Sequence, residues 1–206
     1  MKKIMLVTGA ALALTTWSWA ATVQYETVRD ETWVEVEGDS TLHAWSARST
    51  EPTAESKLAM DPAWWDATVA EGDTVDLKLT FHLPAASLTS GRRSLDRVMH
   101  DALLAGDYPE ISYRLTAATV REVREDESRV LLLEGEYTCA GVTLPAETEV
   151  VIRRSGEQLV IEASRDMLMT DFEIDPPRAM LGAVRAADEV TVSVQWTLRP
   201  SEPEAP

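Results

Sequence analysis

The segment Thr74–Leu83, TVDLKLTFHL, alternates strictly between apolar and polar side chains. Apolar residues occupy every second position from Val75 to Leu83, and polar residues stand between them. A period of two is typical of a β-strand that buries one face and exposes the other. One solvated face is common in antiparallel sheets and rare in parallel ones, so the segment predicts an antiparallel sheet.

Four further stretches repeat this alternation. They are Ile111–Ala117, Thr148–Ile152, Leu159–Ala163 and Val190–Leu198. Ala140–Gly141 and Ser155–Gly156 stand between apolar runs and predict hairpin tips. We therefore expect an all-β domain of about eight antiparallel strands, closed or nearly closed into a barrel, because closure removes the exposed edges of a sheet.

One segment has a helical period instead. Its apolar residues recur three and four positions apart, at Leu95, Val98, Met99, Ala102 and Leu103. This spacing predicts an amphipathic helix over about 95–105, with Ser94 able to cap its start and Gly106 to end it. A second short helix is expected over about 177–187, where Pro177 suits a first turn and Met180, Leu181 and Val184 would share one face.

The first twenty residues have the pattern of a cleaved signal peptide. Lys2 and Lys3 precede the apolar stretch Ile4–Leu14, and Ser18 and Ala20 place small residues where a signal peptidase cuts. The stretch is shorter than the ~20 apolar residues of a membrane span. We therefore expect cleavage after Ala20, export to the periplasm or beyond it, and no stable membrane insertion. The mature domain would cover residues 21–199, followed by a disordered tail over residues 200–206.

The composition of the 206-residue chain excludes several classes of protein. It holds 35 acidic against 19 basic residues, a net charge of −16, and 45% of its residues are hydrophobic. A chain this apolar can build a core, and one this acidic is not expected to bind nucleic acid. Cys139 is the only cysteine, so it forms no internal disulfide and is expected to be a small buried residue in a strand.

Neither a catalytic site nor a metal site is predicted. His43, His82 and His100 lie on three separate elements, and no two of them have the His-x-His or His-x-x-x-His spacing of a local metal site. Asp39, Ser40 and His43 include the residue types of a catalytic triad, but neighbours on one strand cannot converge as a triad requires. We expect a protein that is not an enzyme and needs no cofactor.

Several stretches resemble, in order and spacing, the YceI-like family of exported lipid-binding proteins. They are Gly38–Trp45 (GDSTLHAW), Leu88–Gly91 (LTSG) leading into Leu95–Leu103 (LDRVMHDAL), Tyr108–Ile111 (YPEI), Gly135–Pro145 (GEYTCAGVTLP), Asp171–Ile174 (DFEI) and Asp188–Val192 (DEVTV). The resemblance implies a lipocalin-like antiparallel barrel whose apolar cavity binds a polyisoprenoid, a quinone, a fatty-acid derivative or a similar amphiphilic lipid in the periplasm. It also allows a homodimer. The chain departs from the family at Ala140, where many members have a histidine.

The barrel interior decides the function, because eight strands either fill the interior with side chains or enclose one small ligand. For a hollow barrel, the alternation predicts the lining: Leu77, Leu79, Phe81, Ile111, Tyr113, Leu115, Val150, Ile152, Val192, Val194 and Trp196. In a filled barrel these residues form a packed core, and the protein would be a non-catalytic envelope-stress or protein-interaction module. Trp64 and Trp65 are expected to form a lid or plug rather than a partner-docking patch. Arg92 and Arg93 are either solvated surface charges or contacts for a phosphate headgroup.

Overall fold

The computed structural model describes residues 22–179 and 183–201, and most of the regular structure there is β-strand. The strands are β1 (Val23–Thr27), β2 (Trp33–Ser40), β3 (Trp45–Ser49), β4 (Lys57–Met60), β5 (Leu77–Pro84), β6 (Glu110–Val123), β7 (Arg129–Cys139), β8 (Val142–Ser155), β9 (Gln158–Leu168), β10 (Arg178–Ala179) and β11 (Val184–Pro200). Between them lie α1 (Arg93–Ala102) and four 3-10 turns, η1 (Arg29–Glu31), η2 (Pro62–Trp65), η3 (Ala85–Ser87) and η4 (Met169–Phe172).

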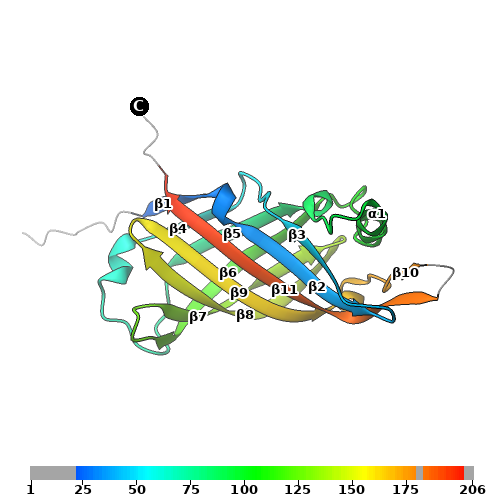
Figure 1. Cartoon of the computed structure of the whole chain (residues 1–206). Coiled ribbons are helices and arrows are strands. Elements are labelled where there is room, and N and C mark those ends of the chain that lie inside the picture. Colours follow the sequence, from blue (N-terminus) through cyan, green and yellow to red (C-terminus); the bar gives the residue numbers. More distant parts are fainter. Residues whose placement is uncertain (1–21, 180–182, 202–206) are drawn as a thin grey trace, which may run out of the picture.

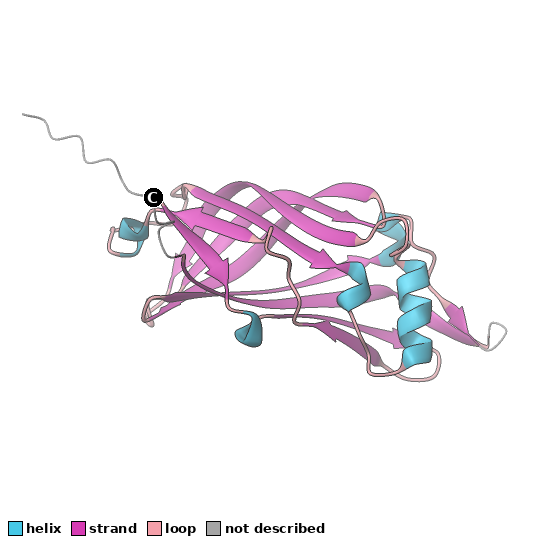
Figure 2. Ribbon diagram, turned by 90° about the horizontal axis from the view of Figure 1, so that it is seen from above, coloured by secondary structure: helices cyan, strands magenta, loops and turns pink. Residues whose placement is uncertain are grey.

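Eight of the strands close into an antiparallel barrel (Figures 1 and 2). Hydrogen-bonded neighbours follow the order β1–β4–β5–β6–β7–β8–β9–β11, and β11 pairs with β1 to complete the ring. β2 and β3 extend the sheet beyond β11, and β10 pairs with the start of β11. The predicted all-β barrel of about eight strands is confirmed.

One edge of β11 is divided between two partners. Residues 186–195 pair with β2, whereas residues 198–200 pair with β1. Between these two stretches lies the buried Thr197, whose amide donates to Oγ1 of the buried Thr32 (3.1 Å) and whose carbonyl accepts from the Val28 amide (2.8 Å). β1 therefore closes one end of the barrel, and β2 with β3 takes its place toward the other end, where α1 lies (Figure 1).

The predicted hairpin tips are confirmed. Cys139 pairs with Val142 across Ala140 and Gly141, and both tip residues have positive φ, 49° and 82°. Positive φ at both positions is the requirement of the two-residue turn that matches the twist of paired strands. In the second tip Ser155 pairs with Gln158 across Gly156 and Glu157, and there only Gly156 has positive φ, 63°.

The predicted first helix is confirmed as α1, with both ends shifted toward the N-terminus. Arg92 rather than Ser94 is the N-cap, and the Asp96 carboxylate accepts hydrogen bonds from the hydroxyl (2.6 Å) and the amide (2.7 Å) of Ser90. These bonds lower the pKa of Asp96. The helix ends before Gly106 because Leu104 already takes the left-handed conformation, with φ 50°.

The second helix predicted over 177–187 is wrong. β10 and the first residues of β11 occupy most of this range, and Met180 and Leu181 lie outside the described residues. From Val184 to Val190, every second residue is more buried than its neighbours. The two-residue period thus continues upstream of the strand predicted at 190–198, and strand pairing with β2 and β10 overrides the helical spacing.

The predicted boundaries at the chain ends meet the structure only in part. Pro200 is the last residue of β11, and the Ser201 amide donates to the Gln24 carbonyl (2.8 Å), so the ordered domain extends past the predicted start of the tail. Residues 202–206 and the predicted signal peptide, residues 1–20, lie outside the described residues.

A glycine makes room for a large aromatic side chain inside the barrel. Gly135 on β7 pairs with Leu115 of β6, beside Tyr113. A Cβ atom at Gly135 would stand 2.5 Å from both the Tyr113 hydroxyl oxygen and the Arg114 carbonyl oxygen. Since these contacts are too short for real side chains, Tyr113 keeps its position only because residue 135 has no side chain.

We expect Gly135→Ala to destabilise the fold by about 1–3 kcal/mol, the usual cost of overpacking a core, because the backbone carbonyl cannot move aside cheaply. Urea denaturation of the two proteins measures the difference. Gly106→Ala is the matched control, since nothing lies within 4 Å of a Cβ there. Equal losses in the two variants would contradict this account.

Candidate ligand-binding cavity

The end of the barrel that β1 closes is packed solid. Its core joins side chains from all eight strands of the ring, and six of its branched aliphatic side chains are no more than 1% exposed: Leu58, Val120, Leu131, Ile152, Leu159 and Leu198. Each such aliphatic side chain contributes about 1.5–3 kcal/mol through removal of its surface from water. This half of the interior stabilises the fold.

Four aromatic side chains form a layer across the interior. The Phe81 ring meets Trp196 edge-on at 5.1 Å between centroids, and Tyr113 lies 4.6 Å from Tyr137. Register completes the layer, because Phe81 pairs with Tyr113 and Tyr113 with Tyr137 on adjacent strands. Burial raises the pKa of both tyrosines, so they are neutral. Tyr137 contacts both the packed core and the open space beyond it, which makes it part of a floor.

Beyond this layer lies a cavity of about 250 Å³. Its walls are almost wholly apolar and come from β2, β3, β5, β6, β7, β9, β11, η4 and α1. The main lining residues are Val34, Val36, Trp45, Leu83, Ile111, Tyr137, Cys139, Met167, Phe172, Val190 and Val192. The cavity thus occupies the end of the barrel where β2 and β3 replace β1.

Helix α1 covers this end of the barrel (Figure 2). Its apolar face lines the cavity with Leu95, Val98, Met99, Ala102 and the adjoining Leu103. Three hydrogen bonds to helix side chains hold the helix against the preceding segment. His100 Nε2 bonds to the Leu88 carbonyl (2.8 Å), and the hydroxyl and amide of Ser90 donate to the Asp96 carboxylate. Leu88 and Met99 are both buried in the small core between them. The helix therefore forms the roof of the cavity, and these contacts hold it on the barrel.

A family-wide sequence profile, that of the YceI-like domain, matches residues 52–198. The chain belongs to the YceI-like family. This confirms the resemblance seen in the sequence, and the match includes β4–β11 with the helix that roofs the cavity. No curated protein sequence matches the chain.

Solved YceI-like structures share this fold at low sequence identity. BcnA of Burkholderia cenocepacia is 14% identical, with a TM-score of 0.65 over 84% of this chain and 99% of the other. A polyisoprenoid binding domain from Saccharophagus degradans is 11% identical, with a TM-score of 0.61 over 87% and 99%. The YceI protein of Campylobacter jejuni is 13% identical, with a TM-score of 0.51 over 98% and 100%. At these identities, the likeness is one of fold.

The residues predicted to line a cavity divide between the two halves of the barrel. Ile111 and Val192 do line the cavity. The others belong to the packed half or lie against it: Leu77, Leu79, Phe81, Tyr113, Leu115, Val150, Ile152, Val194 and Trp196. The alternation correctly identified side chains that point inward, but it carries no information on how far along the barrel each one lies.

Most of the lining escaped prediction, although one signal for it was present. The five apolar residues that defined α1 in the sequence are the same five that line the cavity. In a domain made of strands, an isolated amphipathic helix must place its apolar face on some part of the barrel interior. Met167 continues the two-residue alternation of β9, whereas the lining supplied by Phe172 and Ile174 depends on η4 and has no comparable pattern.

Trp64 and Trp65 plug the packed end and do not cover the cavity. Both pack against the large core, with ring centroids 5.0 Å apart. The Arg129 guanidinium lies 4.1 Å from the Trp64 ring and donates to the carbonyls of Trp64 (2.6 Å) and Trp65 (2.7 Å). A cation stacked on the indole, with two fixed acceptors, immobilises this turn.

Arg92 and Arg93 lie at the start of α1, where both are exposed. Within the described part of the chain, neither forms an ion pair with an acidic side chain closer than 4.0 Å. Their contact with a headgroup stays a prediction. No helix among the described residues has the length and apolar character needed to cross a membrane.

Cys139 offers a native probe of the cavity. Burial raises the pKa of its thiol to about 11, so the thiolate is scarce at pH 8. We expect alkylation by iodoacetamide, followed by mass spectrometry, to accelerate about tenfold per pH unit between pH 8 and 10. Free glutathione is the control, and its rate should level off near the ordinary thiol pKa of about 8.5. A plateau at that pH for Cys139 would contradict its burial.

Proposed function

We propose that the protein is a periplasmic carrier that holds the apolar chain of a polyisoprenoid or a related amphiphilic lipid in the cavity under α1. The observation that carries the proposal is the apolar half-barrel itself, floored by aromatic rings and roofed by a helix. Membership of the YceI-like family supports it, as does the description of the Saccharophagus degradans relative as a polyisoprenoid binding domain. The signal-like first twenty residues support export.

The binding energy would come from the hydrophobic effect. Each methylene group moved from water into an apolar site contributes about 0.8 kcal/mol, so a few isoprene units suffice for tight binding without polar contacts. Apolar cavities of ~150 Å³ already accept a benzene molecule. At about 250 Å³, this cavity encloses a segment of a long chain while the remainder extends through the mouth.

The exposed apolar side chains support access at the same end. Five large hydrophobic residues are well exposed among the described ones. Leu168 lines the cavity, Leu42 and Leu104 are next in sequence to the lining residues His43 and Leu103, and the Tyr108 ring lies against Gly141 in the hairpin that follows Cys139. The fifth, Val123, ends β6 at the packed end. Clusters of exposed apolar surface mark binding sites more often than scattered ones. The alternative function is an interaction module with a filled barrel. It accounts for the packed half of the interior but gives no role to the half that contains the cavity.

Filling the cavity tests the carrier function. Ala102→Trp places a large side chain on the face of α1 that lines the cavity, so we expect its affinity for a fluorescent prenyl or acyl probe to fall at least tenfold. Arg97→Trp is the control, because it places the same side chain on the exposed face of the same helix. Unchanged probe affinity in Ala102→Trp, with unfolding curves like those of the parent protein, would refute binding in this cavity.

The predicted headgroup contact has a separate test. A guanidinium matches phosphate with two parallel hydrogen bonds, so the double variant Arg92→Gln and Arg93→Gln should weaken binding of a prenyl phosphate about three- to tenfold. Binding of the unphosphorylated alcohol should not change. Arg121→Gln, an exposed arginine on β6, is the control. The same affinity ratio between the two lipids in variant and parent would exclude the contact.

A further inference from the structure

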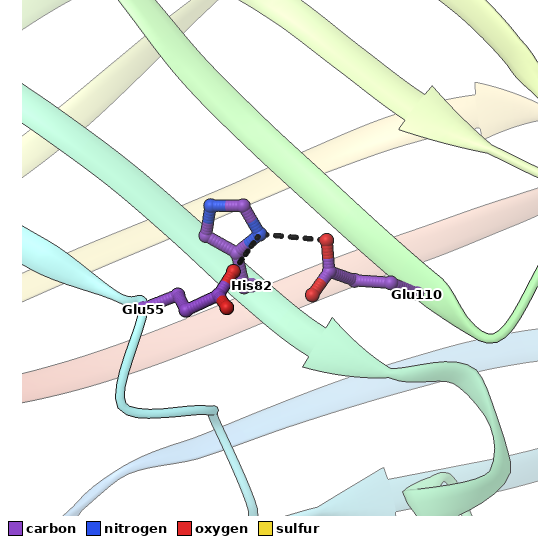
Figure 3. A group of neighbouring side chains, drawn as sticks. All are labelled: Glu55, His82 and Glu110. Atoms are coloured by element: carbon purple, nitrogen blue, oxygen red, sulfur yellow. Dashed lines mark hydrogen bonds and ion pairs between the residues drawn. The ribbon is translucent and has the colours of Figure 1, made fainter.

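Outside the barrel, three side chains from separate segments converge on one point. His82 lies on β5, and its neighbours Phe81 and Leu83 point toward the interior, so the imidazole is on the outer face. Glu110 is the first residue of β6, which pairs with β5. Glu55 belongs to the segment that leads into β4 (Figure 3). None of the spacings between these residues signals a site in the sequence.

The donor atoms of the three side chains lie close together. His82 Nδ1 is 2.7 Å from Glu110 Oε1 and 4.0 Å from Glu55 Oε2, and each residue offers one such atom within 4.8 Å of the other two. In Figure 3 both carboxylates approach the same ring nitrogen, while the second nitrogen points away from them. The imidazole is largely sheltered, with 22% of its side chain exposed.

The polypeptide holds these groups in place through bonds that do not involve the three side chains. Ser56 Oγ accepts from the His82 amide (2.9 Å) and donates to the His82 carbonyl (3.1 Å). The Thr53 amide also donates to that carbonyl (2.9 Å), and Thr80 Oγ1 donates to the Glu55 carbonyl (3.1 Å). Residues 53–56 are thereby fixed along β5, so the backbone positions of Glu55 and His82 need no added ligand.

The cluster carries a negative charge that the protein does not balance. In the part of the chain that the structure describes, no Lys or Arg nitrogen lies within 4.0 Å of either carboxylate; His82 is the only partner of both. One ring nitrogen carries at most one proton and can satisfy only one of the two carboxylates. With the proton on Nε2 instead, the Nδ1 lone pair and two carboxylate oxygens face a common centre.

We propose that Glu55, His82 and Glu110 bind a divalent transition-metal ion, with water completing its coordination. A neutral imidazole with two carboxylates suits Zn²⁺ and its neighbours Ni²⁺ and Cu²⁺, whereas Mg²⁺ and Ca²⁺ prefer sites made of oxygen ligands alone. Two donors at about 2.1 Å from Zn²⁺ in tetrahedral geometry stand about 3.4 Å apart. That separation lies between the two distances observed here, so small rotations of the exposed Glu side chains complete the site.

The bound ion would fasten residues 53–56 to β5 and β6 on the outside of the barrel. Three ligands from three segments make the ion a cross-link between β5, β6 and the connection into β4. The site is separate from the cavity, since none of the three residues lines it. A test of metal binding is therefore independent of the test of lipid binding.

Calorimetric titration with ZnCl₂ tests the proposal on purified protein without a polyhistidine tag, treated with a chelator and dialysed. We expect one equivalent of Zn²⁺ to bind with micromolar affinity and to raise the thermal unfolding temperature. His82→Ala, Glu55→Gln and Glu110→Gln should each weaken binding at least tenfold. Glu51→Gln, an exposed carboxylate of the neighbouring segment, should not.

Three outcomes would overturn the proposal. One is the absence of binding at a millimolar concentration of Zn²⁺. Another is tight binding that survives both His82→Ala and Glu110→Gln, since the ion would then lie elsewhere. The last is equal competition by Ca²⁺, which would show that the imidazole is not a ligand. Circular dichroism of each metal-free variant establishes that the fold is intact. The two glutamine variants change side chains that are 75% (Glu55) and 40% (Glu110) exposed.

Discussion

The hydrogen bonds of Thr197 set the architecture on which the rest of the molecule depends. Its amide is bound by Thr32 Oγ1, its hydroxyl donates to the Glu31 carbonyl (3.0 Å), and its carbonyl accepts from Val28. Both threonines are 1% exposed, so each of these polar groups would be costly to leave unpaired. At this point the edge of β11 passes from β1 to β2. At one end of β11 the strands therefore form a closed ring. At its other end the sheet continues into β2 and β3, and α1 covers the interior there.

The division of β11 explains why one barrel has two kinds of interior. Where β1 closes the ring, buried aliphatic side chains from opposite strands meet in one core. Past β1, the sheet continues into β2 and β3, and α1 supplies the missing wall. The aromatic layer separates the packed core from the cavity. The flat rings of Phe81, Trp196 and Tyr113 cover a wide area with few side chains. The layer also requires glycine at position 135, because a side chain there would collide with Tyr113.

The sequence predicted which residues face inward, since that property depends only on local alternation. It could not predict depth along the barrel, which depends on the register between strands distant in sequence. Val192 and Trp196 both point inward on β11, yet about 13 Å of extended chain separates them, and one lines the cavity while the other lies in the packed core. Glu55, His82 and Glu110 show the same limit more strongly. Their convergence depends on the pairing of β5 with β6 and on Ser56, and no spacing encodes it.

The walls of the cavity differ in how they are bonded to the rest of the barrel. The strand walls are held by long ladders such as β6–β7 and β11–β9, and opening them would break many hydrogen bonds together. Helix α1 keeps its backbone bonds within itself and is fixed to the barrel by the contacts of Asp96 and His100 and by its apolar face. In the proposed carrier, a lipid chain in the cavity would contact the apolar face of the helix as the barrel interior does. Opening a strand ladder costs many hydrogen bonds, whereas the helix is held to the barrel by a few side-chain bonds and by apolar contact.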